Sequence, residues 1–100
     1  MKRITKAWQL FEDRPELWCK GHLAVDKDNK PISPISKNAL RFSAVGALMN
    51  TYSYAKLHKP IVLLAVKVHA EGYPGTPQEW NDHPERRFND MFAMLKKLDI

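Results

Sequence analysis

The sequence predicts a mainly α-helical fold, a compact bundle of about four helices with a small extended loop or hairpin at about residues 22–33. Three observations predict it. Apolar residues recur at helical spacing in several segments, prolines and glycines separate those segments, and a hydrophobic share of 44% supplies a core without disulfides. A chain of 100 residues has room for one such core, so residues 1–100 are expected to form a single domain.

The first half of the chain is predicted to hold two helices with extended chain between them. Residues 4–13 carry apolar side chains at i, i+3, i+4 and i+7, and Pro15 then disfavours helix in the residue before it. Asp, Asn and Pro after residue 21 favour a loop or hairpin, in which prolines permit only an edge strand. Residues 38–57 contain no proline and are predicted as the central, most buried helix, with Ser36 as its cap. One stripe of this helix has small side chains that would let another backbone approach closely: Ala39, Ser43, Gly46, Ala47 and Asn50.

The second half is predicted to hold two further helices. Lys59-Pro60 begins one with proline in its first turn, and Gly72 ends it. A buried strand at residues 61–66 is the main alternative, because a short run of branched apolar residues fits both structures. Two capping-box patterns follow, Thr76 with Glu79 and Asp82 with Glu85. The second is expected to open the last helix, which carries apolar side chains at core spacing: Phe88, Met91, Phe92 and Leu95.

Cysteine content and charge limit the classes of function. Cys19 is the single cysteine, so it has no internal disulfide partner, and the start of the chain lacks the apolar core of a signal peptide. The longest apolar run, residues 61–66, is far too short to span a bilayer. A cytoplasmic protein without a membrane partner is therefore expected. A formal net charge of +5 favours encounter with nucleic acid or an acidic protein surface, although the basic residues are scattered among acidic ones.

Several motifs together resemble a bacterial and phage family of unknown function. They are Trp18-Cys19-Lys20-Gly21, an acidic turn at residues 26–30, Ala39 to Phe42 running into Gly46-Ala47, and Trp80-Asn81-Asp82 before the last helix. The resemblance covers residues 1 to 98, nearly the whole chain. This sequence departs from the family pattern at Phe42, where Trp is usual, and at Ser43, where Cys is usual. The resemblance implies a compact helical fold and a bacterial or phage origin, and it brings no known activity.

Metal binding and catalysis are the minority interpretations. Cys19 and His22 stand three residues apart, but a structural zinc site needs four ligands and a catalytic site three. The other histidines fall on separate segments, so no metal and no cofactor is predicted. A small hydrolase or transferase using Cys19, His22 and Asp82 is the third hypothesis. The chain has no Gly-rich phosphate loop, and an enzyme is therefore less favoured than a binding protein.

The two tryptophan motifs supply the candidate partner or ligand site, and no residue is assigned as catalytic. The candidate residues are Trp18, His22, Trp80, Asn81 and Asp82. The competing structural interpretation has Trp80 packing on the core, Asn81 bonding loop backbone and Asp82 capping the last helix. The sequence leaves open whether the two motifs meet in space and what the oligomeric state is.

The preferred hypothesis is a small non-enzymatic binding protein of phage or mobile-element type that occupies a surface of a host protein. Inhibition of a host defence or nucleic-acid machine is one concrete form of it. The alternative is a nucleic-acid-binding protein, because basic and aromatic side chains together hold phosphates and stack on bases. The residues assigned to that alternative are Arg3, Lys6, Tyr54, Lys56, Lys59, Arg86 and Arg87.

Overall fold

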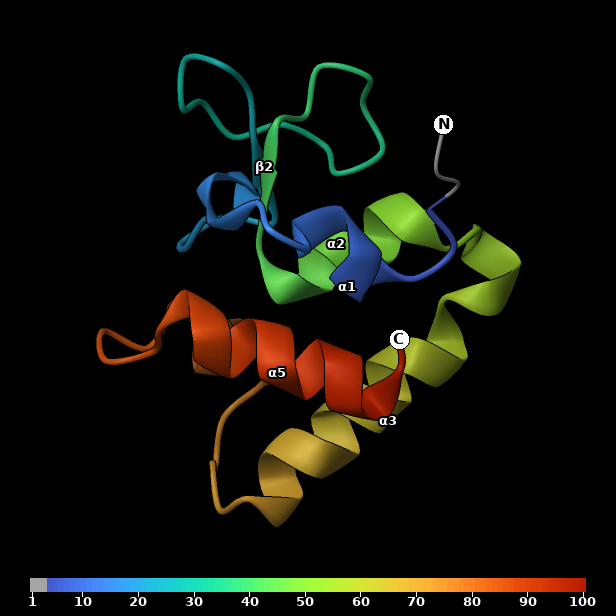
Figure 1. The fold of residues 1–100 in the computed structure, drawn as a ribbon, viewed down its shortest axis with the longest axis vertical. Coiled ribbons are helices and arrows are strands. Elements are labelled where there is room, and N and C mark those ends of the chain that lie inside the picture. Colours follow the sequence, from blue (N-terminus) through green and yellow to red (C-terminus); the bar gives the residue numbers. More distant parts are fainter. Residues whose placement is uncertain (1–3) are drawn as a thin grey trace.

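A computed structural model of the chain describes residues 4–100. Within these residues the chain forms five α-helices, two short 3-10 helices and one antiparallel pair of two-residue strands. Figure 1 shows the path of the chain. In order, the elements are α1 (Ala7–Phe11), η1 (Pro15–Leu17), β1 (Ala24–Val25), β2 (Arg41–Phe42), α2 (Ala44–Thr51), η2 (Tyr54–Lys56), α3 (His58–Ala70), α4 (Pro77–Asp82) and α5 (Phe88–Leu98). The predicted mainly helical fold with a small extended excursion is confirmed.

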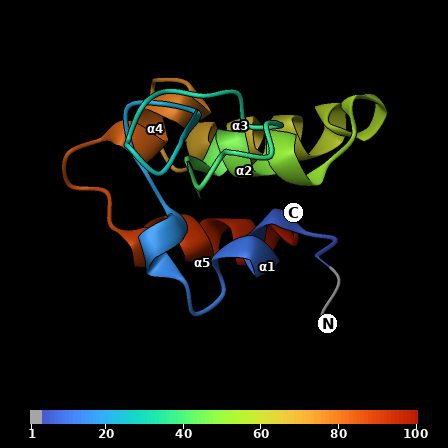
Figure 2. The same ribbon diagram turned by 90° about the horizontal axis from the view of Figure 1, so that it is seen from above.

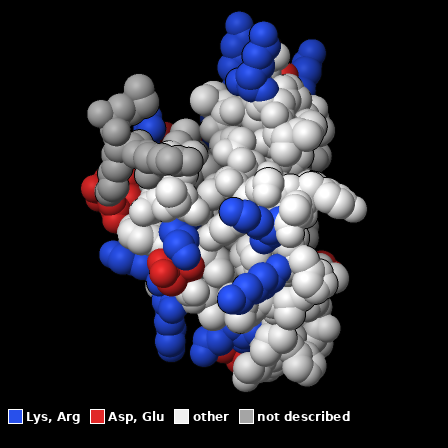
Figure 3. Space-filling model, turned by 90° about the vertical axis from the view of Figure 1, so that its right-hand side faces the viewer, with Lys and Arg blue, Asp and Glu red and all other residues white. Residues whose placement is uncertain are grey.

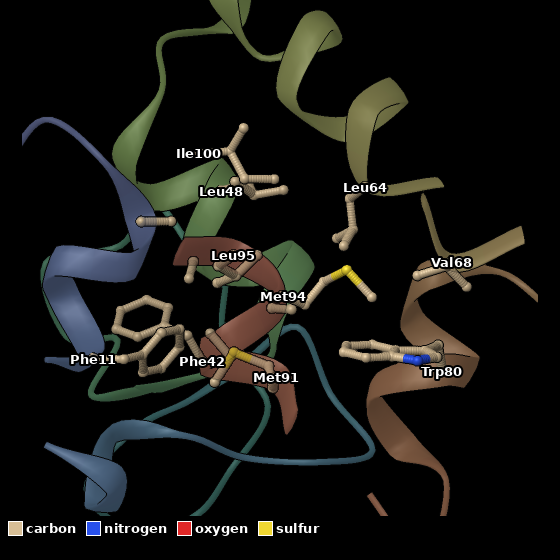
Figure 4. Close-up of a cluster of buried hydrophobic side chains, with 14 residues drawn as sticks. Phe11, Phe42, Leu48, Leu64, Val68, Trp80, Met91, Met94, Leu95 and Ile100 are labelled. Atoms are coloured by element: carbon tan, nitrogen blue, oxygen red, sulfur yellow. The ribbon is translucent and has the colours of Figure 1, made fainter. Parts of the chain in front are cut away.

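The helices form two layers with the core between them. Seen from above, α1, η1 and α5 lie on one side, and α2, α3 and α4 lie on the other (Figure 2). The side chains that meet between the layers are almost fully buried (Figure 4). The core therefore draws on every α-helix, and its large members include Phe11, Phe42, Leu48, Leu64, Val68, Trp80, Met91 and Leu95.

The first helix is shorter than predicted. It runs over Ala7–Phe11, where Ala7 and Phe11 are buried, whereas Ile4 lies outside it and is 46% exposed. Asp13 takes a left-handed conformation with φ of 60° directly after the helix. The backbone N–H of Ala7 donates to the oxygen of Ile100 at 2.8 Å, which ties the start of α1 to the end of α5.

The predicted helix over residues 38–57 is wrong at both ends, because α2 runs only over Ala44–Thr51. Arg41–Phe42 is instead the strand that pairs antiparallel with β1, with Ala24 opposite Phe42. Ser43, and not Ser36, caps the helix, because its Oγ accepts from the backbone N–H of Gly46 at 3.0 Å. Apolar spacing did not separate the strand from the helix, because a two-residue strand is too short to display its own period.

The stripe of small residues in α2 does admit another backbone. A Cβ atom on Gly46 would lie 1.8 Å from the backbone oxygen of Leu23. That oxygen also accepts the backbone N–H of Ser43 at 3.0 Å. The glycine therefore lets the segment before β1 lie directly against α2, which confirms the predicted close approach at this position.

In the second half of the chain, the structure confirms the predicted helix after Lys59-Pro60 and the first of the two predicted capping boxes. Residues 58–70 form a helix, so the strand alternative at residues 61–66 is wrong, and Gly72 follows it with φ of 90°. Thr76 and Glu79 form the predicted capping box of α4. The second box is wrong, because Asp82 is the last residue of α4 and α5 begins only at Phe88.

None of the helices in residues 4–100 is long and apolar enough to cross a membrane.

Candidate functional site

The side chain of Asn81 joins three separate parts of the fold. Its Oδ1 accepts the indole N–H of Trp18 at 2.7 Å and the backbone N–H of Ala44 at 2.9 Å. Its Nδ2 donates to the backbone oxygen of Cys19 at 3.1 Å and to Oδ1 of Asp82 at 2.9 Å. We call these five residues the Asn81 cluster. Asn81 is 0% exposed, and an amide has two acceptor and two donor positions, so its hydrogen-bonding capacity is fully used within the chain.

Asp82 extends the same set of bonds instead of capping the last helix. Its Oδ1 accepts the backbone N–H of Gly21 at 2.9 Å, and both carboxylate oxygens lie 3.2 Å from Nε2 of Gln78. Gln78 in turn accepts the hydroxyl of Ser43 at 2.9 Å through its Oε1. The loop at residues 18–21, the start of α2 and α4 are thus connected through polar side chains.

The contact between Cys19 and His22 that the structure shows is made by the backbone of His22. The thiol lies 3.7 Å from the backbone oxygen of His22, to which it donates, and the imidazole belongs to an exposed residue. Burial raises the pKa of the Cys19 thiol to about 11, against a lowering effect from Arg41 and a further raising effect from Asp82. The thiol is therefore protonated at neutral pH, and a protonated thiol is a poor nucleophile.

Trp80 belongs to the core and not to the polar side of the cluster. It is 3% exposed, and Figure 4 shows its ring beside Val68 and Met94. The guanidinium of Arg86 lies 4.2 Å from the centre of its ring, and Arg86 Nε donates to the backbone oxygen of Trp80 at 2.9 Å. The structure therefore brings Trp18, Asn81 and Asp82 together, with His22 contributing its backbone, and directs Trp80 elsewhere.

The basic residues assigned to nucleic-acid binding fall into two groups. Lys6, Lys56 and Lys59 line one cavity beside η2 and the end of α5, close to the exposed Tyr54. Arg86 and Arg87 precede the other end of α5, which at 11 residues is about 16 Å long. The last residue of the set, Arg3, lies outside the described residues. The described members of the set therefore lie in two groups, one near each end of α5.

One face of α3 carries apolar side chains into solvent. Lys59, Val62, Leu63 and Val66 lie at i, i+3, i+4 and i+7, and therefore form a stripe along the helix. Val62 is 40% exposed, Leu63 37% and Val66 62%. Tyr54 in η2 is 97% exposed. We call this stripe together with Tyr54 and Lys56 the η2–α3 face.

Figure 3 views the side of the molecule on which η2 and α3 lie, and it shows more basic than acidic side chains on a surface that is otherwise uncharged. Lys56 and Lys59 have no ion-pair partner within residues 4–100, where the ion pairs are Lys6 with Asp99, Arg14 with Glu16 and Lys67 with Glu71. This face therefore combines exposed aliphatic groups with positive charge that is not neutralised.

Sequence reasoning missed two features of these sites. Gln78 and Ser43, which extend the hydrogen bonds of the Asn81 cluster, were not predicted, because a single polar residue gives no signal of its partner across the fold. The η2–α3 face did leave a signal, since Val62, Leu63 and Val66 make α3 apolar on more than one side. Within residues 4–100, no three His, Cys, Asp or Glu side chains are grouped so that they could hold a metal ion.

Comparison with known proteins gives a family and no activity. No curated protein and no solved structure matches this chain. A model described as "Family of unknown function (DUF6197)" matches residues 7–98. The matched residues include the whole Asn81 cluster, the η2–α3 face and every helix. The chain therefore belongs to the DUF6197 family, whose function is unknown.

Proposed function

We propose that this chain is a non-enzymatic binding protein that engages an acidic protein partner through the η2–α3 face. The observation that carries the proposal is the stripe of Val62, Leu63 and Val66 on an otherwise well-packed helix. Branched aliphatic side chains lose contact with water when a partner covers them, and each Å² of apolar surface removed stabilises the complex by about 25 cal/mol. A contiguous apolar stripe beside charged groups is typical of a protein interaction site.

The charges around the stripe indicate the chemistry of the partner. Lys56 and Lys59 lie at its start and form no ion pair within residues 4–100, and the whole chain carries a formal net charge of +5. An acidic surface would approach faster and bind in a preferred orientation, because complementary charges steer association. The partner is therefore expected to present aliphatic or aromatic side chains next to carboxylates.

The Asn81 cluster supports the non-enzymatic part of the proposal. Its central amide has no free donor or acceptor position for a substrate, and the nearby Cys19 is held as a thiol. A nucleophilic mechanism would need a thiolate with a base beside it. The polar residues that the sequence offers as candidates for catalysis or ligand binding thus hold the loop at residues 18–21 against α2 and α4.

A host protein is the proposed partner, in line with the bacterial or phage origin that the sequence resemblance implies. Occupying a surface on such a protein needs no catalysis, and inhibition of a host defence or nucleic-acid machine is one form that this occupation would take. The size of the chain suits this role, because an interface of ordinary size buries about 800 Å² on each partner.

A capture experiment with matched variants tests the proposal. The immobilised full chain, a Val62→Asp/Val66→Asp variant and a Leu40→Asp control are exposed to the same bacterial lysate. Leu40 is 43% exposed and lies away from α3, so it matches the exposure of Val62. We expect an acidic protein that the wild type and the control retain and that the double variant loses. Capture of no protein above background, or equal loss by the control, would contradict the proposal.

Nucleic-acid binding is the second candidate, and the shared location of Lys6, Lys56 and Lys59 beside Tyr54 favours it. Phosphate contacts weaken steeply as salt rises, so they are strongest in dilute buffer. A mobility-shift assay with single- and double-stranded DNA and RNA at about 50 mM salt tests it. The absence of any shift under these conditions would remove this candidate and leave the protein partner.

A further inference from the structure

A concave pocket lies next to the η2–α3 face and is formed by segments that are far apart in the sequence. Lys6 directly precedes α1, Tyr52 directly follows α2, and Lys56 is the last residue of η2. The first turns of α3 and the end of the chain supply the other lining residues: Lys59, Pro60, Leu63, Leu98, Asp99 and Ile100. Its volume is about 450 Å³. Pockets that hold small molecules in proteins measure about 300–1,000 Å³, so this one has the size of a ligand site.

The rim of the pocket has more positive than negative charge. Lys6, Lys56 and Lys59 reach it, and Asp99 is the acidic residue among those that line it. Asp99 is already engaged, because Nζ of Lys6 lies 3.6 Å from its carboxylate and donates to its backbone oxygen at 3.0 Å. Lys56 and Lys59 therefore remain as two cations without an acidic partner in residues 4–100.

The pocket lining also includes apolar residues and one further polar group. Pro60 is buried, and Leu63 and Leu98 supply aliphatic surface. The phenol of Tyr52 also lines the pocket, and burial raises its pKa, so it remains a hydrogen-bond donor at neutral pH. A site with apolar lining residues and a few polar groups matches the general composition of small-molecule sites.

We infer that this pocket binds a small organic anion, a carboxylate or phosphate carried on an apolar body. The anionic group lies between Lys56 and Lys59 within reach of the Tyr52 hydroxyl, and the apolar body covers Pro60, Leu63 and Leu98. The concave shape of the pocket favours a small molecule. The neighbouring stripe on α3 is an exposed helix surface and is the part that suits a protein partner. This inference does not depend on the proposed protein partner, since it concerns direct binding by the purified chain.

Titration with three probes that share one alkyl chain tests the inference. The full chain is titrated in dilute buffer with octanoate, octyl phosphate and octanol, and binding is followed by calorimetry and by backbone amide NMR shifts. We expect at least one of the two anions to bind with a Kd of about 1 mM or tighter, and octanol to bind at least about tenfold more weakly. The ratio between the two anions identifies which headgroup the site prefers.

Charge-matched variants establish where the probes bind. Lys56→Gln/Lys59→Gln removes the two unpaired cations, and Lys27→Gln/Lys30→Gln removes two exposed cations from the loop after β1. We expect the first variant to weaken binding of the anions at least about tenfold and the second by less than about twofold, because only the first pair lines the pocket. The amide shifts are expected at residues 52–63 and 98–100.

Three results would overturn the inference: no binding of either anion, equal binding of octanol, or equal loss in both lysine variants. These results are independent of the capture experiment, whose variants change Val62 and Val66 and leave every residue that lines the pocket in place. A chain that binds anions and captures no protein would keep this inference and contradict the proposed function. A chain that captures an acidic protein and binds neither anion would contradict this inference and keep the proposed function.

Discussion

The Asn81 cluster and the η2–α3 face are both built from residues that stand out in the sequence, and they differ in how their groups are satisfied. In the cluster, one buried amide makes four hydrogen bonds to four different residues. On the face, two lysines have no ion-pair partner in residues 4–100, and three aliphatic side chains lie partly in water. The polar groups of the first region are satisfied within the chain, whereas the second region leaves apolar and charged groups exposed to solvent.

This difference teaches where binding is to be sought in a small domain. A polar residue whose donors and acceptors are all filled internally gains nothing from a ligand, and its loss leaves buried groups unpaired. Exposed apolar groups and unpaired charges stabilise a complex when a partner or ligand buries the apolar surface and supplies the opposite charge. Substitutions in the two regions should therefore act on different quantities, stability in the cluster and binding on the face.

The largest expected loss of stability follows Asn81→Ala. The substitution leaves the indole N–H of Trp18, the backbone N–H of Ala44 and the backbone oxygen of Cys19 without their partner. Each unsatisfied buried group costs about 1–3 kcal/mol, so we expect the free energy of unfolding to fall by about 3–5 kcal/mol. Urea unfolding followed by circular dichroism measures this change.

Asn50→Ala is the matched control for that measurement. Asn50 is exposed, and its Nδ2 makes one bond, to the backbone oxygen of Pro34 at 2.9 Å. We expect a loss of about 1 kcal/mol or less. If the two substitutions cost the same, the Asn81 cluster is not the structural connection described above, and the contrast between the two regions fails.

The next largest effect is expected for Gly46→Ala. The added Cβ would lie 1.8 Å from the backbone oxygen of Leu23, so either α2 or the segment before β1 must move. Overpacking a rigid contact costs about 1–3 kcal/mol, and a clash with backbone belongs at or above the upper end of that range. Thermal unfolding of Gly46→Ala beside Gly72→Ala checks it, because Gly72 has open space around its Cβ position and only its φ of 90° opposes the substitution. A smaller loss at Gly46 than at Gly72 would contradict the prediction.

Helix periodicity predicted the overall fold but not the positions at which the cluster is assembled. The helices over α1, α3 and α5 were visible because their apolar spacing persists over several turns or meets a clear stop at proline or glycine. The start of α2 was not, because Arg41–Phe42 forms a strand through pairing with β1, which is a contact across the fold. The same limit applies to Asp82, whose partner Gly21 lies 61 positions away in the chain.

The candidate site was predictable in composition and partly in role, because the structural interpretation had Trp80 on the core and Asn81 bonded to loop backbone, and the structure shows both. Trp18, Asn81 and Asp82 were named together from the sequence, and they do lie together. Their use as a structural link follows from the bonds of Asn81, and a count of donors and acceptors requires coordinates. The pocket beside Tyr52 was not predictable, because it needs Lys6, Lys59 and Leu98 to converge from three segments.

A kinetic effect is expected at Cys19, whose backbone oxygen belongs to the Asn81 cluster. Burial raises the pKa of its thiol from 9.0 to about 11. At pH 8, below both values, the fraction present as thiolate is therefore lower than in the unfolded chain. We expect alkylation by iodoacetamide to be on the order of 10- to 100-fold slower in the folded chain than in urea, and to speed up as the pH rises toward 11. Equal rates at pH 8 would contradict the raised pKa, and a faster rate in the folded chain would show an activated thiol and favour the enzyme hypothesis.

The smallest effect on stability is expected on the other side of the comparison, for Val62→Ser and Val66→Ser. Both side chains are exposed at the surface, Val62 at 40% and Val66 at 62%, so removing their methyl groups leaves no closed cavity, and we expect the free energy of unfolding to change by about 0.5 kcal/mol or less. Leu64→Ala on the same helix provides the contrast, because Leu64 is 0% exposed and its truncation should cost about 2–5 kcal/mol. If the two valine substitutions also cost several kcal/mol, these side chains support the fold itself. The stripe on α3 would then belong with the Asn81 cluster as structure, and the argument for an interaction surface there would be lost.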